Sequence, residues 1–131
     1  FVRTPQTNAY QSYTSDALAA RKQVELGCRL YRLGKLGESA GPEGQYWSLE
    51  LPTDLIEYSK KYGIPPKHQD FNFLESAVLK PGASFITREA PGVAHNSGGA
   101  IEVVINSLES TIEYFCMPWE KKDDSNKPRV I

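Results

Sequence analysis

The sequence predicts an α+β fold in which short helices lie against a strand-rich core. Segments typical of strands, such as the β-branched run Ile101–Ile105, outnumber segments typical of helices. Glycine and proline separate these short segments, and no internal repeat is visible. At 131 residues the chain has the length of one compact domain. These observations together favour a single α+β domain.

End signals predict two helices. Thr14, Ser15 and Asp16 offer an N-cap for a helix whose apolar residues lie between positions 17 and 26, and Gly27 ends it. A second, shorter helix is predicted over residues 54–62, because Gly63 and the prolines behind it would stop it.

Alternating or β-branched patterns predict the strands, which cover residues 28–33, 45–50, 76–79, 84–88, 101–105 and 111–116. In the first of these, alternation places Arg32 on the same side as Leu30, toward a buried or cleft-facing side. The glycine-rich residues 34–44 and residues 91–99 are predicted loops. We interpret residues 1–13 as a lead-in or linker, 14–119 as the folded domain and 120–131 as a charged tail.

Composition narrows the classes of function. The 15 Lys and Arg residues nearly balance the 16 Asp and Glu residues, and no basic stripe appears, so nucleic-acid binding is not expected. The apolar runs are too short to span a bilayer, and no membrane role is expected. Cys28 and Cys116 lack metal-site spacing, which leaves two buried free thiols, the favoured interpretation, or one disulfide.

Three segments each place one polar residue inside a strand that otherwise favours burial. These residues are Arg32, Ser48 and Glu102. A charge inside an apolar strand costs several kcal/mol unless it is paired or faces a cleft. A functional site would explain them. So would exposed positions on edge strands, or structural ion pairs. Further candidates for acidic and basic roles are Glu50, Glu75 and Arg88.

In their order along the chain, these segments resemble the ADP-ribosyltransferase fold. The segments are Leu30-Tyr31-Arg32-Leu33-Gly34, Gln45-Tyr46-Trp47-Ser48 and Gly98-Gly99-Ala100-Ile101-Glu102. The chain is also similar to the NAD-glycohydrolase domains at the C-termini of polymorphic bacterial toxins of the Rhs or contact-dependent inhibition type. The resemblance covers residues 28 to 105 and includes the turn at Lys80-Pro81-Gly82 before Phe85. It implies a split β-sheet and NAD as substrate.

The resemblance assigns catalytic roles to Arg32, Ser48 and Glu102. A guanidinium matches phosphate oxygens in a bidentate way, so Arg32 is the candidate for holding the NAD pyrophosphate. Glu102 would stabilise the positive charge that develops on the ribose, and Ser48 would orient its carboxylate by a hydrogen bond. Tyr46 or Trp47 would stack on nicotinamide, although Trp47 also suits the core. The remaining predicted substrate-binding residues are Tyr31, Gly34 and Phe85.

One position departs from the family pattern. Many arginine-specific transferases carry an acidic or amide residue two positions before the catalytic glutamate, whereas this chain has Ala100. The acceptor of ADP-ribose could therefore be water or a macromolecule. The resemblance further implies secretion as part of a larger toxin, action in the target-cell cytoplasm, and a cognate immunity protein. The absence of a starting Met and of a leader agrees with a fragment of such a toxin.

Two other functions stay open at this point. His68 and His95 could act as base and acid in a metal-independent ribonuclease toxin, although both lie in predicted loops. The chain could also be a non-enzymatic binding module. A metal site is not expected, because His68, Asp70 and His95 supply too few well-spaced ligands.

Overall fold

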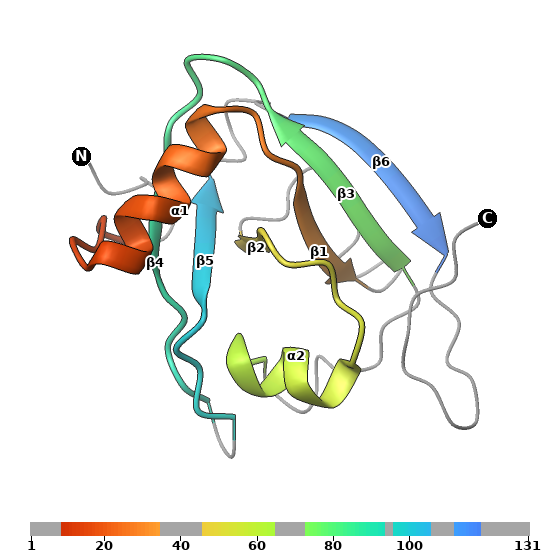
Figure 1. Ribbon diagram of the computed structural model, residues 1–131. Helices are drawn as coiled ribbons and strands as arrows, with labels where there is room; N and C mark the ends of the chain where they lie inside the picture. The colour runs from red at the N-terminus through yellow and green to blue at the C-terminus, as the bar shows by residue number, and fades with distance from the viewer. Residues whose placement is uncertain (1–8, 35–45, 65–72, 94–95, 106–111, 119–131) are drawn as a thin grey trace.

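The computed structural model describes residues 9–34, 46–64, 73–93, 96–105 and 112–118, the last of these by their backbone only (Figure 1). Two helices and a six-stranded antiparallel sheet make up this part of the chain, which confirms the α+β class. The sheet order is β4-β5-β2-β1-β3-β6. In chain order the elements are α1 (Ser15–Glu25), β1 (Leu30–Gly34), β2 (Tyr46–Ser48), α2 (Leu55–Lys61), β3 (Phe73–Leu79), β4 (Phe85–Glu89), β5 (Ile101–Ile105) and β6 (Ile112–Pro118).

Both helices begin and end where their local signals predict. The Thr14 side chain accepts a hydrogen bond from the backbone N–H of Ala17 and so caps α1. The Asp54 carboxylate accepts from the N–H groups of Ile56 and Glu57 and caps α2. The chain leaves α2 through Gly63, whose φ of 59° lies in the left-handed region that favours glycine.

The predicted strands are confirmed, with different bounds for some of them. β3 begins at Phe73, earlier than the predicted position 76, because Leu74 and Glu75 pair with β1 on one side and β6 on the other. This pairing on both sides satisfies their backbone groups, which no pattern within the segment reveals. β2 is shorter than predicted and pairs through Ser48 with Tyr31 of β1 and with Glu102 of β5.

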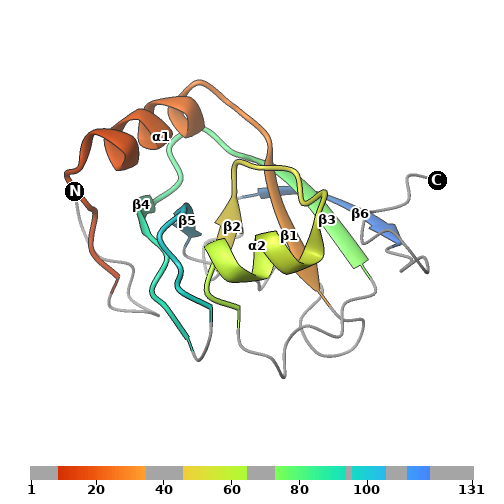
Figure 2. The same ribbon diagram turned by 60° about the horizontal axis from the view of Figure 1, so that its bottom comes forward.

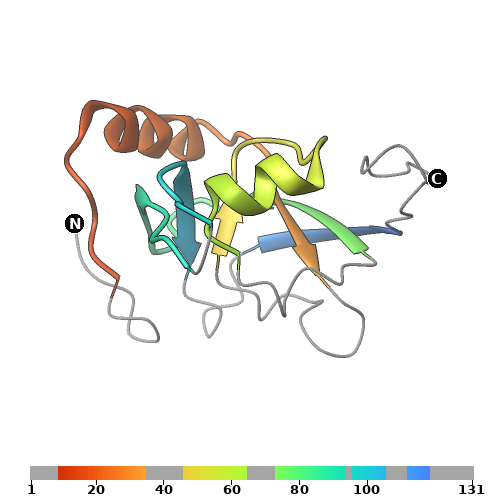
Figure 3. The same cartoon turned by 90° about the horizontal axis from the view of Figure 1, so that it is seen from below.

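The register divides the strand residues between two faces, because cross-strand partners share a face and neighbours along a strand alternate. One face carries a core cluster that includes Leu30, Trp47 and Val103, and Val24 of α1 packs against it. Leu33 and Leu74 point to the other face, where Tyr58 of α2 packs on them. We call these the α1 face and the α2 face. Figures 2 and 3 show α1 beside β4 and β5, and α2 beside β2 and β1.

Residues 9–12, which the sequence analysis assigns to a lead-in, pack against the edge strand β4. The backbone N–H of Ser12 donates to the carbonyl of Thr87, and the buried Gln11 bonds both the Thr87 hydroxyl and its N–H. Ala9 is buried against Ile86 and Val104. This segment therefore covers an otherwise open sheet edge.

Cys28 is an exposed free thiol, so the expectation of a buried thiol is wrong for this residue. It lies between Gly27 and the start of β1, outside the alternation that would turn it inward. The side chain of Cys116, the predicted loop residues 35–44, the tail 120–131 and both histidines lie outside the described residues. No helix in the described part is both long and apolar enough to cross a membrane.

Candidate functional site

A row of polar side chains crosses the α2 face at the middle of the sheet. Arg88 of β4 is the cross-strand partner of Glu102 in β5. Glu102 pairs on its other side with Ser48 in β2, and Ser48 pairs in turn with Tyr31 in β1. Partners in such a row have Cβ atoms about 4.5–5.5 Å apart. The sheet therefore brings two of the three predicted catalytic residues, Ser48 and Glu102, side by side on one face.

Glu102 is a buried carboxylate with one charged partner. Its residue is 6% exposed, and its Oε2 accepts a hydrogen bond of 2.9 Å from Nε of Arg88. Burial raises the pKa of Glu102 above its ordinary value, because it disfavours the ionised form. The charge and the hydrogen bond of Arg88 act in the opposite direction and favour the carboxylate. The alternative that Glu102 belongs to an ion pair thus holds, and Arg88 is the partner.

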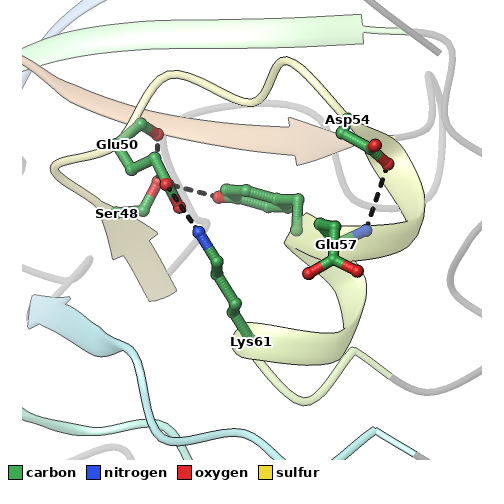
Figure 4. A network of polar contacts seen from close by, with 6 residues as sticks. Ser48, Glu50, Asp54, Glu57 and Lys61 are labelled. Carbon is green, nitrogen blue, oxygen red and sulfur yellow. Dashed lines mark hydrogen bonds and ion pairs between the residues drawn. The ribbon is translucent and has the colours of Figure 1, made fainter. Parts of the chain in front are cut away.

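Ser48 is fully buried, and its hydroxyl bonds to groups other than Glu102. Oγ lies 2.8 Å from the carbonyl of Glu50, 3.2 Å from that of Tyr31 and 2.8 Å from the hydroxyl of Tyr58. The two carbonyls can only accept from Oγ, whereas either hydroxyl can donate in the contact between Ser48 and Tyr58. The predicted hydrogen bond from Ser48 to Glu102 is not formed, because the Ser48 hydroxyl bonds to Tyr31, Glu50 and Tyr58. Figure 4 shows Ser48 beside Glu50.

An open groove of about 530 Å³ lies between the end of α2, the residues that follow β2 and the start of β5. Its lining residues are Leu49, Glu50, Lys61, Tyr62, Ala100 and Ile101. Lys61 and Glu50 form an exposed ion pair of 3.0 Å on its wall. Tyr62 packs on Tyr58 with ring centroids 4.6 Å apart, and burial raises the pKa of both phenols. Both phenols therefore stay protonated as hydrogen-bond donors at neutral pH.

The groove wall formed by α2 is fastened to the β4–β5 connection by backbone hydrogen bonds. The N–H groups of Gly98 and Ala100 donate to the last helical carbonyls, those of Lys60 and Lys61. A Cβ at Gly98 would lie 2.3 Å from the carbonyl oxygen of Ala90, and φ at this residue is 73°. Gly98 is thus needed for its close approach to the backbone of Ala90. The two hydrogen bonds to Lys60 and Lys61 join α2 to the segment that leads into β5.

Arg32 does not join Ser48 and Glu102. It lies on the α1 face, where its Nη1 bonds Oε2 of Glu75 at 2.8 Å and its guanidinium carbon lies 5.7 Å from the Trp47 ring centroid. The Glu75 side chain is fully buried and that of Arg32 is 13% exposed. The geometry agrees with the alternative of a structural ion pair for Arg32. Convergence of all three residues on one face is not observed.

The predicted substrate-binding aromatic residues also divide between the faces. Trp47 is 1% exposed and packs in the core on the α1 face, so the core alternative applies to it. Phe85 also packs against this core, with the Arg21 guanidinium over its ring. Tyr31 and Tyr46 lie on the α2 face, and Tyr46 is 47% exposed. Gly34 is the last residue of β1 and pairs with Phe73.

Sequence reasoning missed Tyr58, Tyr62 and Lys61 as groups beside the site. Tyr58 and Tyr62 are separated by one helical turn and share a helix face, which is the signal that could have identified them. In the described ranges, no cluster of three or more His, Cys, Asp or Glu side chains could hold a metal ion. His68 and His95 lie outside those ranges.

Comparison with known proteins finds no matching family model, curated protein or solved structure for this chain.

Proposed function

We propose that the domain cleaves the bond between nicotinamide and ribose in NAD and transfers ADP-ribose to water or to a macromolecular acceptor. The observation that carries this proposal is the position of Glu102. It is a buried carboxylate in β5, paired with Ser48 in β2, and it directly follows Ile101, one of the residues that line the open groove. A carboxylate held in a low-dielectric site stabilises a developing positive charge far more than it would in water.

The proposed reaction begins with cleavage of the N-glycosidic bond of NAD. The N-glycosidic bond breaks with its electron pair moving onto the nicotinamide ring, which neutralises the pyridinium and leaves positive charge on the ribose. In this proposal the Glu102 carboxylate stabilises that charge. Water or an acceptor nucleophile then forms a bond to the same ribose carbon and releases its proton. Tyr46 is the exposed aromatic residue on this face that is suited to stacking on the nicotinamide.

The proposal gives Ser48 a positioning role that does not involve contact with Glu102. Its hydroxyl ties β2 to Tyr58 of α2, and so it holds the helix that walls the groove. Arg32 takes no part in the proposed reaction, because it lies on the opposite face of the sheet, paired with Glu75.

The decisive experiment is to incubate the purified domain with NAD and to measure nicotinamide release, with and without a cell lysate. Release without lysate indicates hydrolysis, whereas label incorporation that depends on lysate indicates transfer. Glu102→Gln should lower the rate roughly 10²-fold or more while the fold survives, because one well-placed electrostatic group contributes about that much. Retention of more than about a tenth of the rate would remove Glu102 from the catalytic role.

A toxin role makes a second expectation. Expression of the domain in a bacterial cytoplasm should stop growth, and the Glu102→Gln variant should be harmless. A producer cell would then need a cognate immunity protein that covers the groove beside α2. Equal toxicity of the two forms would point away from NAD chemistry and toward another activity, such as a ribonuclease.

A further inference from the structure

Arg88 is the cation that lies directly across from Glu102 on the α2 face. It belongs to β4, and its side chain is 26% exposed whereas that of Glu102 is 7% exposed. Arg88 is therefore the more exposed partner of the pair, and part of its side chain is open to solvent while Nε contacts the buried carboxylate.

The contacts of Arg88 use only a small part of its hydrogen-bonding capacity. A guanidinium carries five N–H donors in a planar fork, and Nε supplies the bond to Glu102. In the described part of the chain, Arg88 makes no other hydrogen bond or ion pair. Its terminal nitrogens are thus available for two parallel hydrogen bonds, the geometry that matches phosphate oxygens.

An exposed aromatic ring supports the guanidinium. The guanidinium carbon of Arg88 lies 6.0 Å from the ring centroid of Tyr46. Tyr46 precedes Ser48 by two residues in β2 and therefore lies on the same face. Such a contact helps to fix the plane of an arginine without occupying its N–H groups. Arg88 and the exposed Tyr46 ring therefore lie together on the α2 face beside Glu102.

We propose that Arg88 is a substrate-binding residue that holds a phosphate of the dinucleotide with its terminal nitrogens and holds Glu102 with Nε. This inference rests on the proposed function, because it names the group that recognises the anionic part of the same substrate. Arg88, in place of the sequence-predicted Arg32, is then the residue that binds the phosphates of NAD.

Charge complementarity favours this assignment. NAD carries a cationic pyridinium on one side of a ribose and an anionic pyrophosphate on the other. The site places the Glu102 carboxylate next to the Arg88 guanidinium in the same row. Glu102 can therefore face the ribose, on which positive charge develops, while Arg88 faces the phosphates.

The test uses binding of ADP-ribose and of inorganic pyrophosphate, measured by calorimetry. The Glu102→Gln variant is the reference, because it lacks the buried charge that removal of Arg88 would leave unpaired. The test variant is Glu102→Gln with Arg88→Gln. The matched control is Glu102→Gln with Lys80→Gln, which removes the same charge from the exposed turn before β4. Thermal melts establish that each form is folded.

We expect the Glu102→Gln and Lys80→Gln control to bind ADP-ribose like the reference, and the Arg88→Gln form to bind about tenfold more weakly or worse. Equal affinity of the test variant and the control would overturn the proposal, as would absence of ADP-ribose and pyrophosphate binding in all forms. If the test variant does not fold, Arg88→Lys in the same background replaces it. It keeps the charge but loses the fork, and unchanged affinity would again overturn the proposal.

These outcomes are independent of the proposed activity. If the wild-type domain releases no nicotinamide from NAD, the proposed function fails even where ADP-ribose binding depends on Arg88. If nicotinamide is released but replacement of Arg88 does not change the affinity for ADP-ribose, only the assignment of Arg88 fails.

Discussion

Arg32 and Glu102 point to opposite faces of the same sheet, although their strands are separated only by β2. Each residue forms an ion pair with its own cross-strand partner, Arg32 with Glu75 and Glu102 with Arg88. The two pairs differ in burial. The pair on the α1 face has a fully buried carboxylate, whereas the pair on the α2 face reaches solvent through Arg88. This difference suggests a structural role for the first pair and a functional role for the second.

The Arg32–Glu75 pair should behave as a buried structural pair. We expect Arg32→Met to lower the free energy of unfolding by about 3–5 kcal/mol, because it removes the guanidinium from a carboxylate that has no access to water. Replacement of both Arg32 and Glu75 by Met should restore much of this loss. Urea denaturation measures both values. A loss below about 1 kcal/mol for Arg32→Met would match a surface pair and contradict the buried geometry.

The same position also separates the two candidates for the phosphate holder. Binding of NAD raises the melting temperature by mass action. If Arg32 only stabilises the fold, Arg32→Lys should keep the NAD-induced rise that the wild type shows. A rise that disappears in Arg32→Lys but not in Arg88→Lys would return the phosphate role to Arg32.

Burial of Glu102 predicts the acidic limb of the pH profile. The carboxylate must be ionised to stabilise positive charge, and burial raises its pKa above the ordinary value of 4.5. Nicotinamide release should therefore fall at a higher pH than an exposed glutamate would give, as pH is lowered. A pH profile of kcat measures this limb. A limb at the ordinary value would mean that another group titrates.

The raised pKa of Glu102 also affects stability. The folded state binds the Glu102 proton more tightly than the unfolded state does. The contribution of this proton to folding stability is therefore fully present below the pKa of Glu102 in the unfolded state. That contribution is lost as pH rises through the pKa of Glu102 in the folded state. The stability of Glu102→Gln relative to the wild type should therefore increase with rising pH across that window. Melting temperatures of the two forms at several pH values check the sign, and the opposite trend would contradict it.

The hydrogen bond between Ser48 and Tyr58 should show coupling in a double-mutant cycle. Ser48→Ala leaves the buried Tyr58 hydroxyl without its hydrogen-bond partner and should cost about 1–3 kcal/mol, whereas Tyr58→Phe should cost about 1 kcal/mol. The double variant should cost less than the sum of the two, because neither group is then left unsatisfied. Additive losses in denaturant titrations would show that the two hydroxyls do not interact.

Gly98 should be much less tolerant of alanine than Gly82. Both have positive φ, but a Cβ at Gly82 meets nothing within 4 Å, whereas at Gly98 it would lie 2.3 Å from the carbonyl oxygen of Ala90. Gly82→Ala should cost only the conformational strain of about 1–2 kcal/mol. Gly98→Ala should cost more, and displacement of the Gly98 backbone should lower the protection from hydrogen exchange of the Gly98 and Ala100 amides, which donate to α2. Similar losses at both positions would exclude the close approach of Gly98 to Ala90.

Much of the local structure could be predicted from the sequence because its causes lie within a few residues. The cap residues Thr14 and Asp54, and the glycines that follow the helices, define both helices with little regard to the rest of the chain. The β-branched run in β5 and the glutamate inside it were also visible, whereas the burial of that glutamate was not. The role of Arg88 as the partner of Glu102 was not visible either, because the two residues are fourteen positions apart and meet only through register.

The sequence by itself determined the helix ends, the positions of the strands and the presence of charged residues inside them. Only the tertiary structure decided which of those charges share a face. The side-chain period of a strand is two, so the face of a residue depends on how its strand pairs with its neighbours. Pairing of Tyr31, rather than Arg32, with Ser48 put Arg32 on the α1 face and left Glu102, Ser48 and Arg88 together on the α2 face.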